Sequence, residues 1–108
     1  MTFDLIGWGA LNVDRLCKIN DFAPIDGETF IFEEKKSCGG SASNTIIGAS
    51  KLGLNTGYIG KIGNDPNGQM MKDYLEKNNV DTDHLIIDSE GETGEVLGFI
   101  DADGNRKL

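Results

Sequence analysis

The sequence contains little cysteine, little proline and no long hydrophobic run: its 108 residues include two cysteines and two prolines. No segment approaches the roughly 18 consecutive apolar residues expected of a membrane-spanning helix, and the N-terminus lacks the basic region of a signal peptide. Cys17 and Cys38 are too few and too far apart for a disulfide framework or a C-x-x-C metal site. We therefore expect a cytoplasmic protein with two reduced thiols.

Positive charge is absent from residues 81–104, which contain eight acidic residues and no lysine or arginine. The remaining sequence has equal numbers of acidic and basic residues, so this stretch accounts for the whole formal net charge of −8. A nucleic-acid surface needs a cationic patch, and so does binding to an anionic membrane. We expect neither nucleic acid nor a membrane as a partner.

Hydrophobic periodicity predicts alternating strands and helices. The apolar run over residues 3–9 is typical of a strand buried on both faces, with Trp8 in the core. Further strands are expected over residues 13–19 and 29–33, paired as a hairpin, and over 54–62, 84–87 and 94–100, with helices over 41–52 and 65–78. This order predicts an α/β fold with an inserted antiparallel piece.

The helix ends carry local signals. Ser41 or Ser43 is expected to N-cap the first helix, and Gly53 to end it. Asp65 is expected to N-cap the second helix, with Pro66 at its first position.

The last segment indicates an incomplete fold. Residues 101–105 are expected to form a turn, and only three residues, ending at Leu108, follow it. Three residues are too few to complete a hairpin with the strand at 94–100. We therefore expect residues 1–108 to be the front part of a longer protein.

Nucleotide-binding loops of the common types are missing. A dinucleotide fingerprint requires glycine where Asn12 stands, followed at once by a helix rather than a strand. No G-x-x-x-x-G-K-[ST] segment occurs either. A dinucleotide-dependent oxidoreductase is therefore disfavoured.

Two segments could bind a polyol. Asn12 and Asp14 follow the first strand, where ligands bind in α/β sheets, and their side chains suit vicinal hydroxyls; an Asx turn explains the pair equally well. Gly39 and Gly40 precede a helix whose free N–H groups and nearby Asn44 could also face a ligand. An ordinary glycine-rich loop is the alternative there.

Taken together, these residues resemble the PfkB (ribokinase-like) family of carbohydrate and nucleoside kinases. The resemblance extends over essentially the whole sequence. Two positions depart from the family pattern: Ile46 replaces a small residue, and Ser41 stands where ribokinases usually have lysine, which puts ribose specificity in doubt. The matching positions are Gly7, Gly9, Asn12, Asp14, Gly39, Gly40, Ala42, Asn44, Gly53, Gly63, Asp65 and Gly68.

The resemblance implies a mostly parallel sheet flanked by helices, with a small β lid built from about residues 13–34 and 94–108. It implies that acceptor hydroxyls are bound by Asn12, Asp14, Gly39, Gly40 and Asn44, with Ser41 a weaker member.

The apolar residues of the lid have two possible roles under this resemblance. Apolar side chains such as Phe30, Phe32 or Phe99 either cover the sugar or lie in a homodimer formed through the lid.

The resemblance also implies ATP and Mg²⁺ as cofactors. The family's catalytic aspartate lies in a downstream Gly-Ala-Gly-Asp segment that does not occur in residues 1–108. The catalytic residue is therefore expected beyond Leu108, and no catalytic residue, cofactor-binding residue or metal ligand is assigned within the sequence.

The expected function is ATP-dependent phosphorylation of a sugar hydroxymethyl group. The alternatives are a nucleoside kinase of the same family and a non-catalytic sugar-binding module. The acidic residues 81–104 disfavour a sugar-phosphate acceptor, because like charges repel.

Overall fold

The computed structural model describes residues 2–107, which divide into two compact units. The first unit contains the chain up to Val13 together with Cys38–Gly94. The second contains Asp14–Ser37 and the residues from Glu95 onward. The chain therefore passes between the units three times.

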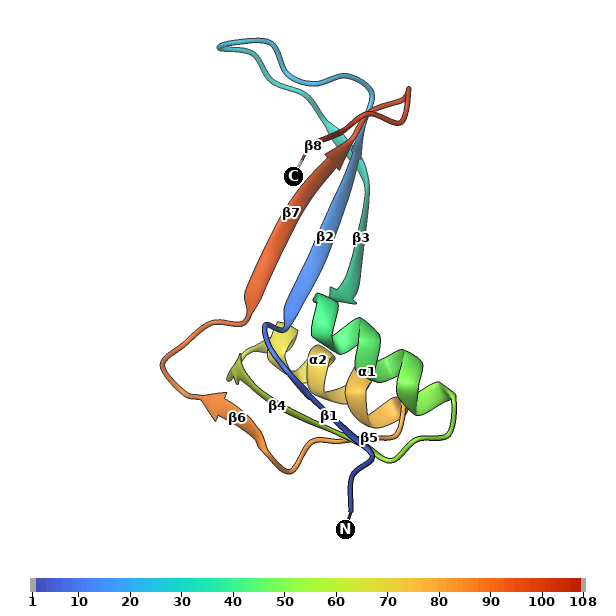
Figure 1. Ribbon diagram of the computed structural model, residues 1–108. Coiled ribbons are helices and arrows are strands. Elements are labelled where there is room, and N and C mark those ends of the chain that lie inside the picture. The colour runs from blue at the N-terminus through green and yellow to red at the C-terminus, as the bar shows by residue number, and fades with distance from the viewer. Residues whose placement is uncertain (1, 108) are drawn as a thin grey trace. The chain divides into compact units, whose positions relative to one another are not determined.

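The first unit is built on a parallel sheet (Figure 1). Its strands are β1 (Leu5–Trp8), β4 (Thr56–Gly63), β5 (Val80–Asp81) and β6 (Leu85–Asp88). β4 pairs with each of the other three strands, always in parallel. The ribokinase-like expectation of a mostly parallel sheet is confirmed for this unit.

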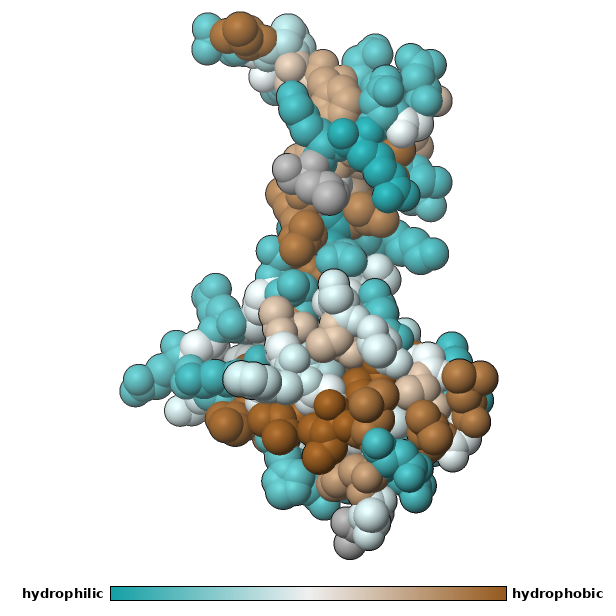
Figure 2. Space-filling view, viewed as in Figure 1, coloured by the Kyte–Doolittle hydropathy of each residue, from teal (hydrophilic) through white to brown (hydrophobic). Residues whose placement is uncertain are grey.

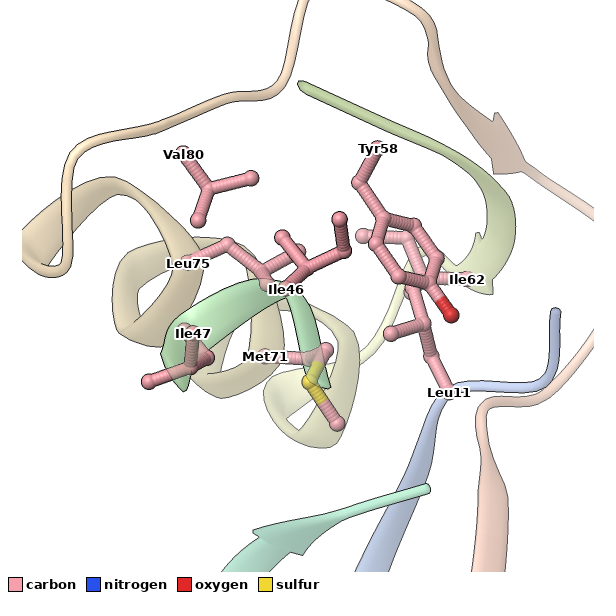
Figure 3. Packing of buried hydrophobic residues seen from close by; sticks show 8 residues of the cluster. All are labelled: Leu11, Ile46, Ile47, Tyr58, Ile62, Met71, Leu75 and Val80. Atoms are coloured by element: carbon pink, nitrogen blue, oxygen red, sulfur yellow. The ribbon is translucent and has the colours of Figure 1, made fainter. Parts of the chain in front are cut away.

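Two helices, α1 (Ser41–Lys51) and α2 (Pro66–Lys77), pack on one face of this sheet. Their apolar side chains meet residues of β4 and β5 in a single buried cluster (Figure 3). Burial of such side chains is the main favourable contribution to folding. The cluster consists of Leu11, Ile46, Ile47, Tyr58, Ile62, Met71, Leu75 and Val80.

Within residues 2–107 the opposite face of the sheet is exposed, and this differs from the sequence prediction for residues 3–9. Trp8 is 82% exposed and lies beside Ile59, its partner in the parallel register, while Ile6 and Ile86 are also exposed. Figure 2 shows a band of hydrophobic surface across the first unit. Trp8 is outside the core because both helices lie on the other side of the sheet, where Gly7 faces Ile46.

The start of α2 and the end of α1 agree with the sequence prediction, whereas the start of α1 does not. Asp65 caps α2 by accepting the Gly68 N–H at 2.7 Å, and Gly53, at φ 94°, follows the last residues of α1. The N-cap of α1, however, is Gly40, with no side-chain hydrogen bond to the first turn. Neither serine is the cap, because the backbone turns into the helix one residue earlier.

The second unit contains one sheet with the order β3-β2-β7-β8. The strands are β2 (Asn12–Ile19), β3 (Ile31–Gly39), β7 (Gly94–Ile100) and β8 (Arg106–Lys107). No helix within residues 2–107 has the length and apolar character needed to cross a membrane.

The end of the chain agrees with the sequence prediction. β8 pairs antiparallel with β7 through Arg106 and Lys107 only, whose partners are Ile100 and Phe99. Two paired residues do not complete a hairpin along the seven-residue strand β7. Leu108, the last residue of the expected lid segment 94–108, lies outside the described residues. The expectation of a catalytic residue beyond Leu108 concerns residues outside this sequence and stays a prediction.

Candidate functional site

The candidate site lies where the chain leaves β1 and meets the start of α1. A Cβ atom at Gly40 would lie 2.6 Å from the carbonyl oxygen of Ala10, and one at Gly9 would lie 3.1 Å from the Cβ of Ala42. Gly40 also has φ 112°, a conformation that side-chain-bearing residues rarely adopt. The glycines therefore allow the two backbone segments to approach closely.

Ser43 holds this turn from inside the molecule. Its side chain is fully buried, and its hydroxyl lies 2.9 Å from the carbonyl oxygen of Gly39 and 3.0 Å from that of Gly40. From the sequence, Ser43 is expected only as a possible helix cap, and this role is not predicted. The sequence feature that could have predicted these hydrogen bonds is a small polar residue three positions after a glycine pair. At that spacing its hydroxyl can reach back to the preceding turn.

The N-terminus of α1 is open to a ligand. Its first turn has neither an acidic residue nor a side-chain cap, so its first N–H groups are without helical partners. Ser41 and Asn44 are both exposed on this turn, and the Asn44 N–H donates to the Gly40 carbonyl at 3.0 Å. Backbone donors and a side-chain amide are therefore available together.

A third segment reaches the site beside Asn12. A Cβ atom at Gly94 would lie 2.4 Å from the Asn12 Oδ1 atom, so the amide of Asn12 rests against the backbone of the residue that begins β7. Five of the residues predicted to bind the acceptor lie in segments of the first unit that converge at the end of β1. They are Asn12, Gly39, Gly40, Ser41 and Asn44.

Asp14 is the sixth predicted residue and the first residue of the second unit. It follows Asn12 by two positions in β2, so both side chains project from the same face of that strand. Within residues 2–107, the side chains of Asn12, Asp14 and Asn44 form no hydrogen bond or ion pair. Their polar groups are therefore available to a ligand.

Ile46, which departs from the family pattern, belongs to the core behind this site. It is 2% exposed, and a Cβ atom at Gly7 would lie 2.3 Å from the Ile46 Cγ1 atom. The larger side chain of Ile46 therefore occupies the space that the glycine leaves open.

Acidic and metal-ligating residues do not gather at this site. Across residues 2–107, no group of three or more histidine, cysteine, aspartate or glutamate side chains is arranged to hold a metal ion. His84 lies in the turn before β6 and is exposed. No residue of the described chain is therefore assigned to a metal.

Curated proteins with similar sequences include several 5-dehydro-2-deoxygluconokinases. The chain is 43% identical over 89 residues to the one from Halalkalibacterium halodurans, covering 82% of this chain and 26% of that protein. It is 39% identical over 89 residues to a protein of the same name from Bacillus subtilis, with the same coverage. The chain spans about a quarter of the length of these relatives.

Solved structures with the same fold include kinases of several substrate classes. A nucleoside kinase of Methanocaldococcus jannaschii, from the ribokinase family, matches with a TM-score of 0.85 and 26% identity, over 94% of this chain and 34% of that one. An uncharacterised sugar kinase of Pyrococcus horikoshii, solved with ATP, matches with a TM-score of 0.75 and 29% identity, over 95% of this chain and 33% of that one. The ribokinase of Arabidopsis thaliana, solved with ribose and ATP, shares the fold with a TM-score of 0.89 at 21% identity, over 99% of this chain and 35% of that one.

The family model described as pfkB family carbohydrate kinase matches residues 13–108, which is most of the chain. The sequence resemblance, the fold and this match agree, and the chain belongs to the pfkB family of carbohydrate kinases.

Proposed function

We propose that the full-length protein is an ATP-dependent phosphotransferase that phosphorylates a hydroxymethyl group of a sugar, and that this chain supplies its acceptor-binding part. The supporting observation is the convergence of Asn12, the Gly39–Gly40 turn and the open start of α1. Hydrogen-bonding groups from three segments can hold several hydroxyls in one orientation, which is the main task of an acceptor site in phosphoryl transfer. The catalytic residue of this reaction is proposed to lie beyond Leu108.

Each residue has a distinct proposed role. The carboxylate of Asp14 accepts hydrogen bonds from two acceptor hydroxyls, and the amides of Asn12 and Asn44 both donate and accept. Gly39 and Gly40 allow the acceptor to approach the backbone, and Ser41 contributes less, from the exposed first residue of α1.

The acceptor that we propose is 5-dehydro-2-deoxygluconate, the compound indicated by the name of the curated relatives. A gluconate derivative carries a carboxylate, and the uncapped N-terminus of α1 favours negative charge because its N–H groups and helix dipole point toward the ligand. Ser41, in the position of the ribokinase lysine, is consistent with an acceptor other than ribose.

A nucleoside acceptor is the second candidate. It is favoured by the similarity to the nucleoside kinase of Methanocaldococcus jannaschii at 26% identity. The two candidates differ in charge, because a nucleoside is neutral and gains nothing from an anion-binding helix terminus.

We propose ATP as the phosphoryl donor, together with Mg²⁺. Related structures were solved with ATP, which supports this donor. The described residues offer no gathered set of metal ligands, so none of them is assigned to Mg²⁺.

We further propose that residues of about 13–34 and 94–108 form a lid, and that the protein dimerises through it in the cytoplasm. Phe30 is 81% exposed and Phe32 is 61% exposed, next to and within β3, the edge strand of the second sheet. Exposed apolar side chains at the start of an edge strand offer a surface on which a second copy can pair. Sedimentation equilibrium of the full-length protein should show a dimer that the Phe30→Ser/Phe32→Ser variant loses; a wild-type monomer would contradict this arrangement.

The activity is tested by measuring ADP release from the full-length protein with candidate acceptors. The set comprises 5-dehydro-2-deoxygluconate, ribose, fructose, fructose 6-phosphate, adenosine and guanosine. We expect the first to give the highest kcat/KM. The sugar phosphate should be inactive, because its phosphate carries more negative charge than a carboxylate and is repelled more strongly by the acidic residues 81–104. Preference for a nucleoside would support the second candidate, and binding without ADP release from any acceptor would support a sugar-binding module.

Asp14→Asn tests the site itself. The amide keeps the size of the side chain but removes its charge, and we expect acceptor-dependent ADP release to be abolished because hydrogen bonds to the charged group are lost. Asp73→Asn is the matched control, since Asp73 is exposed on α2 and accepts a hydrogen bond from Gln69 at 2.8 Å. Full activity in Asp14→Asn would refute the role of Asp14.

A further inference from the structure

A second hydrogen-bonded cluster joins Asp65, at the start of α2, to Thr93, just before β7. The Oδ2 atom of Asp65 accepts the Thr93 N–H at 2.9 Å, and its Oδ1 atom accepts the Thr93 hydroxyl at 2.7 Å. The cap to the Gly68 N–H is therefore one of three hydrogen bonds that this carboxylate accepts. Helix capping alone does not account for the other two.

The side-chain hydroxyl of Thr93 is buried and both donates and accepts a hydrogen bond. Thr93 is 7% exposed, and while its hydroxyl donates to Asp65, the same oxygen accepts the Gly63 N–H at 2.9 Å. Buried polar groups that are fully hydrogen-bonded fix a single arrangement. The cluster consequently fixes the backbone at the end of the segment 91–94.

The two glycines around Asp65 are required by this cluster. A Cβ atom at Gly63 would lie 2.6 Å from the Gly91 carbonyl oxygen and 2.7 Å from the Thr93 nitrogen. One at Gly68 would lie 2.2 Å from the Gly63 carbonyl oxygen and 2.9 Å from the Thr93 Oγ1 atom. The two glycines therefore allow both the close turn before α2 and the docking of Thr93 against it.

The cluster reaches the candidate acceptor site through one residue. Gly94 follows Thr93 directly, and its Cα lies so close to Asn12 that a Cβ atom would be 2.4 Å from the Asn12 Oδ1 atom. All of these residues belong to the first unit. A displacement of the segment 91–94 would therefore remove the surface on which the Asn12 amide rests.

We propose that Asp65 and Thr93 are positioning residues for acceptor binding, acting by holding Gly94 against the amide of Asn12. This inference rests on the proposed function, in which Asn12 contacts the acceptor. Neither Asp65 nor Thr93 contacts the acceptor itself. Their effect is on the orientation of Asn12, where displacements of about 1 Å are enough to matter.

The test uses the full-length protein, with 5-dehydro-2-deoxygluconate as the probe in calorimetric titrations and steady-state kinetics. Thr93→Val keeps the side-chain shape and removes the hydroxyl, whereas Thr93→Ser keeps the hydroxyl. We expect Thr93→Val to raise the acceptor Kd and KM about tenfold with little change in kcat, as loss of ground-state binding does. Thr93→Ser should bind as the wild type does.

A stability control separates positioning from general destabilisation. Val80→Ala truncates a residue of the hydrophobic core, in β5, that makes no part of the Asp65–Thr93 hydrogen-bonded cluster. It should lower Tm without raising KM. An equal rise of KM in Val80→Ala and Thr93→Val would overturn the inference. If Thr93→Val does not fold, Asp65→Asn takes its place, because its amide oxygen can still cap α2 while its nitrogen, in place of Oδ2, cannot accept the Thr93 N–H.

A double-mutant cycle with Asn12→Ala decides whether the effect passes through Asn12. We expect Thr93→Val to cause no additional loss of acceptor binding once the Asn12 amide is absent. Independent, additive losses would show that the cluster acts elsewhere and would overturn the inference, leaving the proposed function intact. Unchanged acceptor binding in Asn12→Ala itself would instead reject the proposed role of Asn12, and the positioning inference with it.

Discussion

Gly40 lies directly against Ala10, so close that a Cβ atom at Gly40 would be 2.6 Å from the Ala10 carbonyl oxygen. Gly40 also has φ 112°. Gly40→Ala should therefore lose about 1–3 kcal/mol from backbone strain and more from the overlap, and should weaken acceptor binding. Urea unfolding and acceptor titration measure the two effects. Gly53→Ala is the control, because φ there is 94° but no atom lies within 4 Å, and it should keep acceptor affinity.

Ser43 supplies the second prediction. Ser43→Ala removes the buried hydroxyl that reaches the carbonyls of Gly39 and Gly40, which should destabilise the protein by about 1 kcal/mol and raise the acceptor KM. The matched control is Thr45→Val, because the Thr45 hydroxyl makes a similar bond to the Ser41 carbonyl at 3.0 Å on the exposed side of α1. Equal KM values in the two variants would argue against a role of Ser43 in the site.

Tyr58 supplies the third prediction. Within the described residues its hydroxyl is buried without a hydrogen-bond partner, and burial raises the pKa of this group (Figure 3). Tyr58→Phe removes only the unpaired hydroxyl, so the midpoint of thermal unfolding should stay the same or rise. Tyr58→Leu should lower it, because the ring fills the core between Leu11 and Ile46. A clear drop in Tm for Tyr58→Phe would reveal a partner for the hydroxyl.

Asp65 supplies a prediction of pH dependence. Hydrogen bonds from the Thr93 N–H, the Thr93 hydroxyl and the Gly68 N–H hold the pKa of Asp65 below its usual value. Its contribution to stability is therefore complete above the unfolded pKa, about 3.9, and is lost as the pH falls through the lower folded pKa. The stability difference between the wild type and Asp65→Asn should shrink on acidification, as urea unfolding at pH 7 and pH 3 would show.

A constant difference across that range would contradict the assignment of the lowered pKa to Asp65. The pKa values of Glu34, Asp88 and Asp101 are also lowered, but these groups are present in both proteins and cancel in the comparison.

Local features of this protein followed from the sequence by itself. Asp65 and Pro66 mark the start of α2, and Gly53 marks the end of α1, because caps depend on a few adjacent residues. The spacing of the glycines and Asn44 indicated the family, since it records where backbone must turn and where a helix begins.

The tertiary structure alone decided which residues lie inside and which residues far apart in the chain meet. The sequence predicts Trp8 in the core, yet within residues 2–107 it is exposed because both helices cover the other face of the sheet (Figure 1). Thr93 carries no sequence signal, because its partner Asp65 is 28 positions away. Periodicity reports that a face is apolar, whereas contacts between distant segments depend on how the whole chain packs.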